Sequence, residues 1–157
     1  MSVNTTKIVM SILGNQNLLR YLSYLGDDPL DENLPNVSPM VVKQNNVVLT
    51  QFNQDILMDT KILMFINPFK GRFTSKALAN DVYAIEIIIP YKYWLIEDTG
   101  ELRAFSIAYE IAKTIDQQNI AGIGDVNIIE WNSYKINEIF SGLTLFIEVT
   151  NAAIKGK

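Results

Sequence analysis

The chain has 157 residues, a length typical of one domain, since domains usually run to roughly 100–200 residues. Hydrophobic residues make up 48% of it and charged residues 19%, so it has enough apolar side chains to build a core and too many for intrinsic disorder. The sequence contains no His and no Cys. This excludes Ser-His-Asp and Cys-His nucleophiles, zinc or haem held by imidazole or thiolate, and disulfide bonds.

Thirteen Lys and Arg residues against seventeen Asp and Glu residues give a net charge of −4. Binding to nucleic-acid phosphates normally needs a basic surface, so this balance disfavours direct DNA binding. The first ten residues include polar Asn4, Thr5 and Thr6 where a signal peptide would carry its apolar run. The longest apolar runs are far shorter than the roughly 20 residues that cross a bilayer. We therefore expect a soluble protein that is not exported and has no membrane partner.

Residues 5–25 are predicted to form an N-terminal helical segment. Apolar side chains recur at helical spacing on both sides of an interruption at residues 14–17, which fits either one kinked helix or two short ones. Thr5 or Thr6 is placed to cap the start, and Gly26 follows where a left-handed residue would end the segment.

Residues 26–40 are predicted to form a loop, because Pro35 and Pro39 lie within a polar stretch. The loop contains an acidic run made up of Asp27, Asp28, Asp31 and Glu32. A solvated connector is the simplest interpretation of this run. Its carboxylates would in principle also suit Mg²⁺, which prefers oxygen ligands.

Residues 41–150 are predicted to form a core of strands and one helix, and residues 151–157 a frayed tail. A short hairpin is expected over residues 41–49, where paired valines flank a turn-forming Gln-Asn-Asn. The segment 69–80 has neither strand nor helix periodicity. Further strands are expected at residues 61–66, 82–89, 126–131 and 143–150, and the helix at residues 101–116. We therefore expect a single domain over residues 1–157.

Strands arranged around isolated helices indicate an α+β fold. We expect a mainly antiparallel sheet covered on one face by the amphipathic helix of residues 101–116, with the N-terminal helix in addition. The apolar stripe of this helix is Phe105, Ala108, Ile111, Ala112 and Ile115, whereas Arg103 and Glu110 fall elsewhere.

The second face of the sheet also needs cover. The strand at residues 82–89 places Ile85 and Ile87 on one face and Glu86 and Ile88 on the other. Ile88, Phe146 and Trp131 are expected on the face away from the helix of residues 101–116. Either a neighbouring subunit or the N-terminal helix would cover it.

Carboxylates are the most common general bases that remain, apart from Lys and Tyr, so a hydrolase with two carboxylates is the enzyme to consider. Asp98 and Glu101 lie in one turn, but no pair stands out. The Gly-Ile-Gly at residues 122–124 follows a helix and precedes a strand, the reverse of a dinucleotide-binding fingerprint. We therefore expect a protein that is not an enzyme and that has no cofactor or metal.

Two groups of side chains are candidates for contact with a partner. Lys70, Arg72, Phe73 and Lys76 interleave charge with aromatic rings; this pattern fits an ordinary loop, a protein contact, or stacking on single-stranded nucleic acid. Tyr91, Tyr93 and Trp94 cluster after the strand at residues 82–89, and such clusters occur both at interfaces and in cores.

The order of the predicted elements carries a family resemblance. A leucine-rich stretch at residues 17–22 ends the N-terminal segment and the acidic, proline-bearing loop follows it. An apolar strand ends at a proline (83–90), a helix begins near Arg103 after a turn, and a late apolar strand covers residues 140–149. This layout resembles the tail terminator and related neck proteins of tailed bacteriophages over most of residues 5–150.

The resemblance implies a ring of subunits, usually six, that caps the tail tube, stops its polymerisation and joins it to the head-side connector. The protein would be made in the cytoplasm of the bacterial host and would reside in the neck of the virion. The tail tube protein and the connector would be its partners. DNA would pass through the ring without specific binding, because six copies at −4 carry −24 and like charge keeps a polyanion mobile.

Within such a ring, the basic residues Lys70, Arg72 and Lys76 would pair with the acidic run of an adjacent subunit. The alternatives are another ring of the neck, such as a head-closure or connector component, or a Mg²⁺-dependent hydrolase that uses carboxylates. A small adaptor that binds peptides at a sheet edge is a further alternative.

Overall fold

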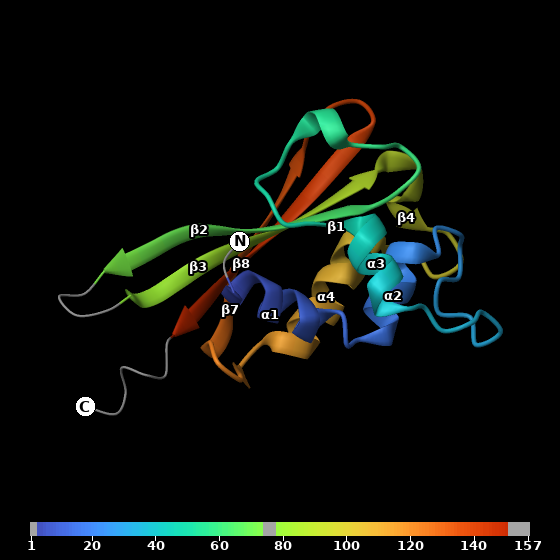
Figure 1. Cartoon of the computed structure of the whole chain (residues 1–157). Coiled ribbons are helices and arrows are strands. Elements are labelled where there is room, and N and C mark those ends of the chain that lie inside the picture. The colour runs from blue at the N-terminus through green and yellow to red at the C-terminus, as the bar shows by residue number, and fades with distance from the viewer. Residues whose placement is uncertain (1–2, 74–77, 151–157) are drawn as a thin grey trace.

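The computed structural model describes residues 3–73 and 78–150 and has an α+β fold, as predicted (Figure 1). The helices are α1 (Val3–Ile12), α2 (Gln16–Ser23), α3 (Pro39–Asn46) and α4 (Arg103–Ile115), with short 3₁₀ turns η1 (Gln54–Ile56) and η2 (Tyr91–Tyr93). The strands of the main sheet are β1 (Val47–Val48), β2 (Leu63–Phe73), β3 (Leu78–Pro90), β6 (Gln118–Ile120), β7 (Gly124–Lys135) and β8 (Phe140–Thr150). A small ribbon consists of β4 (Leu95–Ile96) and β5 (Glu101–Leu102).

The main sheet has the strand order β1-β2-β3-β8-β7-β6. β1 runs parallel to β2 and all other neighbours are antiparallel, so the curled sheet is mixed but mainly antiparallel, as expected. β2 and β3 project together at one side of the molecule as an arm, and β8 is paired with β3 as far as Asn80 (Figure 1).

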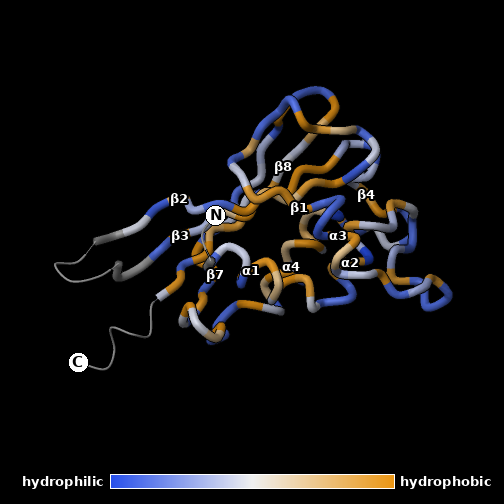
Figure 2. Tube along the Cα trace, viewed as in Figure 1, coloured by the Kyte–Doolittle hydropathy of each residue, from blue (hydrophilic) through white to orange (hydrophobic). Residues whose placement is uncertain are grey.

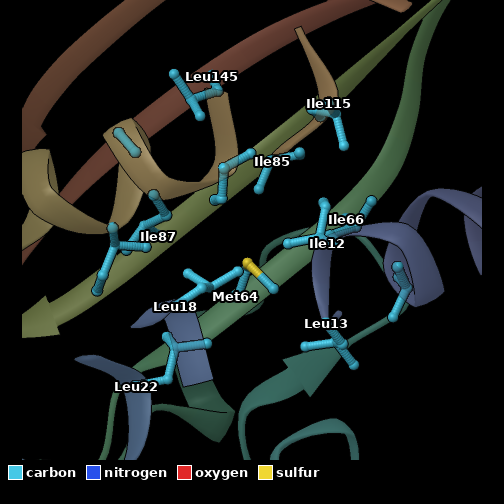
Figure 3. Packing of buried hydrophobic residues seen from close by; sticks show 14 of the residues in the cluster. Ile12, Leu13, Leu18, Leu22, Met64, Ile66, Ile85, Ile87, Ile115 and Leu145 are labelled. Atoms are coloured by element: carbon cyan, nitrogen blue, oxygen red, sulfur yellow. The ribbon is translucent and has the colours of Figure 1, made fainter. Parts of the chain in front are cut away.

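The hydrophobic core lies between one face of the sheet and the helices α1, α2 and α4 (Figures 1 and 3). Ile85 and Ile87 of β3 and Leu145 of β8 point to this face, as the alternation predicts. Leu18 of α2 and Ile115 of α4 meet them from the helix layer. Figure 2 shows the apolar residues concentrated between these two layers and polar residues along the arm.

The N-terminal segment is two helices rather than one kinked helix. Asn15 separates them, because its side-chain oxygen caps α2 by accepting a hydrogen bond from the Leu18 amide at 3.2 Å. The prediction that Gly26 ends the helix was wrong. The helix ends at Ser23, with Tyr24 extended, and the Gly26 carbonyl instead accepts a hydrogen bond from a buried arginine.

The prediction of a hairpin over residues 41–49 was also wrong, because α3 occupies most of that segment. Pro39 suits the first turn of a helix, where its missing N–H leaves no intrahelical bond unmade. Val42 then points into the core, and the buried Asn46 amide donates to the carbonyls of Leu22 and Ile62. These tertiary contacts favour the helix over the local turn signal.

The interruption expected after residue 66 is absent, and β2 continues to Phe73. Pro68 is tolerated because β2 is an edge strand from this point, where a missing N–H breaks no inner ladder bond. A register shift between Pro68 and Lys70 absorbs the irregularity. Residues 69–73 therefore belong to a strand and not to a loop, and β3 begins at Leu78; residues 74–77 lie outside the described residues.

Helix α4 confirms the predicted helix, but its buried face is wider than expected. Arg103 and Glu110, placed outside the apolar stripe by periodicity, are 1% and 6% exposed. Both have polar partners in the N-terminal region. Asn15 donates to the Glu110 carboxylate at 2.8 Å, so α4 is joined to the cap of α2 by polar as well as apolar contacts.

The sheet face opposite the helices is only partly covered. Ile88 lies on it as predicted, in a small cluster with Leu63, Phe65 and Phe140. Phe52 and Leu57, from the loop between β1 and β2, pack over this cluster. The N-terminal helix therefore does not cover the second face, since α1 and α2 lie on the first.

Trp131 lies on the helix side of the sheet, contrary to expectation. A bulge between Ile128 and Glu130 inserts one residue into β7 and so exchanges the faces of the residues that follow. Trp131 is consequently paired with Leu145, and its ring lies edge-on to Phe105 of α4 with the centroids 5.3 Å apart.

Ile85 lies at the centre of this core and is fully buried, whereas Ile129 at the bulge is 52% exposed. Replacing Ile85 with Ala should lower the free energy of unfolding by about 2–5 kcal/mol, because it leaves a cavity that rigid neighbours cannot fill. Ile129→Ala should change it by less than about 0.5 kcal/mol. Urea denaturation measures both, and equal losses would contradict the placement of the core.

Candidate interaction surfaces

The acidic loop is held on the end of α2 by a buried arginine. Arg20, 8% exposed, donates to the carbonyls of Asp31 and Leu34, each at 2.8 Å. The side chains of Asp27, Asp28 and Glu32 stay exposed, and that of Asp31 is half-buried. Anchored through its backbone, the loop presents a fixed acidic surface to solvent.

A second buried arginine joins this loop to the aromatic segment. Arg103 donates from Nε to the Tyr93 carbonyl at 2.9 Å and from Nη2 to the Gly26 carbonyl at 2.8 Å. Its Nη1 reaches the carbonyls of Tyr24 at 3.0 Å and Tyr21 at 3.4 Å. Burial lowers the pKa of Arg103 from its ordinary value, and these carbonyls supply the hydrogen bonds that a buried cation requires.

The aromatic residues that follow β3 divide between core and surface. Tyr93 and Trp94 are half-buried and pack against the core, and Tyr91 is 39% exposed. The rings of Tyr91 and Trp94 lie 6.4 Å apart, and Lys92 lies over the Tyr93 ring at 5.1 Å. The segment therefore forms the rim of the core beside the acidic loop.

The basic residues lie on the arm. Lys70 is exposed on β2, Arg72 and Phe73 are paired with Asn80 and Leu78 of β3, and Lys76 lies outside the described residues. Figure 1 shows the arm at one end of the molecule and the acidic loop beyond α2 at the other. One chain thus does not bring the two groups together.

The carboxylates considered for catalysis are dispersed. Glu101 accepts hydrogen bonds from the Tyr21 hydroxyl at 3.2 Å and from Ser106 at 3.0 Å, and burial together with the Glu101 charge raises the pKa of Tyr21. Asp98 is exposed in the turn before β5. Within residues 3–73 and 78–150, no three acidic side chains gather as metal ligands.

A feature that the sequence did not single out is a groove on the sheet face away from the helices, here called the open-face groove. It has a volume of about 440 Å³. Its lining consists of Gln51, Phe52, Asn67, Pro68, Phe69, Ala84, Glu86, Thr144 and Phe146. The sequence signals for it are Glu86, a single carboxylate inside the apolar strand at residues 82–89, and Phe146, which was predicted on this face of the sheet.

Glu86 is held in this groove by a network that crosses three strands. The Tyr134 hydroxyl of β7 donates to Glu86 Oε1 at 3.2 Å, and Asn67 of β2 is hydrogen bonded to the same carboxylate. Tyr134 reaches Glu86 by passing over Gly142, where an added Cβ would lie 2.6 Å from its ring. Glycine at 142 therefore permits the contact, which a larger residue would displace.

Burial dominates the acid–base properties of this network. It raises the pKa of Glu86 above the ordinary value of 4.5, although the hydrogen bonds from Tyr134 and Asn67 act in the opposite direction. Burial also raises the pKa of Tyr134 to about 12, with the Glu86 charge adding to the effect. Tyr134 therefore remains a hydrogen-bond donor throughout the neutral range.

Comparison with known proteins assigns the chain to a family. The YomW family model matches residues 15–149, from the cap of α2 to the end of β8. The chain belongs to the YomW family. This is a family of the Bacillus phage SPBc2 type, so the protein is phage-related. No curated protein matches the sequence.

The match covers nearly all of the core of this YomW-family protein, including both buried arginines and the open-face groove. It begins after α1, so the first helix lies outside the matched region. In the part of the chain that the structure describes, no helix is long and apolar enough to cross a membrane.

Arg103→Ala in this YomW-family protein should lower the free energy of unfolding by about 3–4 kcal/mol, because four carbonyls lose their donor. Arg103→Lys should be intermediate, since one ammonium cannot reach all four acceptors. Lys113→Ala is the control, because its ammonium is exposed and 3.9 Å from Glu110; such pairs contribute less than about 1 kcal/mol. Equal losses for Arg103→Ala and Lys113→Ala, measured by urea denaturation, would contradict the role of Arg103.

Because the pKa of Glu86 is raised, we expect its contribution to stability to depend on pH. A carboxyl whose folded-state pKa is raised contributes stability below its unfolded pKa and loses it as pH rises through the folded-state pKa. Glu86→Gln keeps an oxygen for Tyr134 and removes the buried charge. The variant should therefore be more stable than the wild type at about pH 7.5 and lose this advantage at about pH 4. Thermal unfolding at both pH values measures the difference, and a less stable variant at neutral pH would refute the prediction.

Proposed function

We propose that this protein is a structural component of a phage particle that assembles head-to-tail into a ring at the head-proximal end of the tail. As a tail terminator, the ring would stop polymerisation of the tube and join the tail to the head connector. The observation that carries this proposal is that Lys70 and Arg72 on the arm and the acidic loop lie at opposite ends of the molecule (Figure 1).

Opposite charges at opposite ends favour contacts between different copies over contacts within one chain. A head-to-tail contact of this kind closes into a ring when the rotation between neighbouring subunits divides a full turn, and otherwise it builds an open filament. Lys70 on the arm and Asp27, Asp28 and Glu32 on the loop are exposed and so free to form such contacts. The buried arginines Arg20 and Arg103 keep the loop ready for a partner, which reduces the entropy lost on assembly.

Membership of a phage-related family supports a role in the particle. A ring of six copies with −4 each carries −24, which would repel DNA that passes through its lumen. DNA would therefore not be bound. The proposed partners are further copies of the chain, the tail tube protein and the connector. The neighbouring assignment, a head-closure or connector ring, predicts a different position in the neck.

The test is a charge swap read out by light scattering. The wild type should show a mass near six times 17.8 kDa at high concentration or when mixed with tail tubes. Lys70→Glu alone and Asp28→Lys alone should each weaken assembly at least about tenfold, and the double variant should recover part of it, because the opposite charges face each other again. Lys135→Glu makes the same charge change outside both surfaces and should have no effect.

A wild-type protein that stays monomeric and does not join purified tail tubes would overturn the proposal. Negative-stain images of particles with labelled protein decide between the two neck positions. Label at the junction of tail tube and neck supports the terminator, and label on the portal side identifies the head-closure ring.

A further inference from the structure

We propose that the open-face groove binds an arginine side chain presented by a partner protein. The proposal rests on the chemistry of the groove and does not depend on the formation of a ring. It assigns a role to Glu86, which no part of the assembly proposal uses.

The first argument is the unpaired charge of Glu86. The carboxylate is half-buried near the middle of the sheet, with β2 and β8 on either side of its strand. Its hydrogen bonds come from the neutral groups of Tyr134 and Asn67. Among the described residues no Lys or Arg forms an ion pair with it. A partly desolvated charge without a counterion is costly, so a cation from outside would be bound favourably.

The second argument is the aromatic part of the groove lining. The rings of Phe69 and Phe146 lie 5.0 Å apart at 59° to each other, and Phe69 is 62% exposed. Phe52 lines the groove from the loop that covers the small cluster. Aromatic faces attract cations, and a planar guanidinium can stack on a ring while it donates to a carboxylate.

The polar groups that line the groove favour arginine over a metal ion. Glu86 is the single carboxylate of the lining, and Thr144 and Asn67 are neutral, whereas Mg²⁺ or Ca²⁺ would need several oxygen ligands. A carboxylate that accepts two hydrogen bonds keeps further acceptor sites for a guanidinium. At about 440 Å³ the groove has room for one long side chain.

The charged residues of this chain also bear on which protein supplies the arginine. Glu130 is paired with Phe146 and lies exposed on the same face of the sheet, which adds negative potential beside the groove, whereas Lys70, which follows Phe69 of the lining, adds one positive charge. The chain has three arginines, and two of them, Arg20 and Arg103, are buried on carbonyls of their own chain. The third, Arg72, lies on the arm, which the ring proposal directs to the acidic loop of a neighbouring copy, so a different protein is the proposed source of the arginine.

The test uses the full-length protein and a short peptide, acetyl-Gly-Arg-Gly-amide, with acetyl-Gly-Gln-Gly-amide as the neutral match. Two-dimensional NMR follows the backbone amides of Ala84, Glu86 and Thr144. The arginine peptide should shift these amides saturably and the glutamine peptide should not. Glu86→Gln should weaken binding about tenfold or more, because a charge-assisted hydrogen bond is lost.

Two further variants separate a binding role from a structural one. Glu97→Gln removes the same charge from an exposed site outside the groove, so it should bind the peptide as the wild type does. Phe69→Ala removes an exposed ring and should weaken binding of the arginine peptide more than binding of a lysine peptide. Thermal unfolding confirms that each variant is folded.

Three outcomes would overturn the proposal. The groove amides fail to shift at saturating peptide, or Glu86→Gln and Glu97→Gln weaken binding equally, which indicates general attraction to an acidic protein. The third outcome is that the same amides shift with protein concentration alone, which identifies a second copy of the chain as the occupant of the groove.

Discussion

The burial of Arg103 is the constraint on which the arrangement of the surfaces depends. Its guanidinium binds carbonyls from the end of α2, from Gly26 and from Tyr93, and one of these contacts spans 82 residues. A buried guanidinium needs acceptors at the positions of its N–H groups, so these segments are held in one arrangement. The acidic loop begins at this point, and Arg20 fixes the rest of its backbone. Two arginines that expose almost no charge thus position a surface that exposes several carboxylates.

The two faces of the sheet have different physical roles. The face covered by α1, α2 and α4 is closely packed and apolar, and it supplies the stability of the fold. The other face has a small cluster under the loop between β1 and β2, and Glu86 lies in a groove beside it. Burial disfavours the charged form of Glu86, as its raised pKa indicates, so an ionised carboxylate at this position lowers the stability of the fold at neutral pH. Such a local cost is typical of positions that serve binding, where stability and function pull in opposite directions.

Much of the fold could be predicted from periodicity, and the failures have identifiable physical causes. The alternation of Ile85 and Ile87 against Ile88 and the stripe of α4 are local patterns, and both were confirmed. Residues 39–46 became a helix because Asn46 and Val42 find partners distant in sequence. Trp131 changed face because a single bulge shifted the register of β7. Neither cause can be recognised from a short window of sequence.

The sequence by itself determined the class of the protein. Its lack of His and Cys, its acidity and its hydrophobic periodicity set the accessible chemistry, the charge and the α+β layering. The tertiary structure alone decided which polar groups are buried and which charges lie at opposite ends. Arg103 and Glu110 are read as surface residues from helical spacing, yet both are buried on partners from the N-terminal region. A polar group can be buried only where the fold places hydrogen-bond partners beside it. These partners are distant in the sequence, so a linear pattern of residues does not predict them.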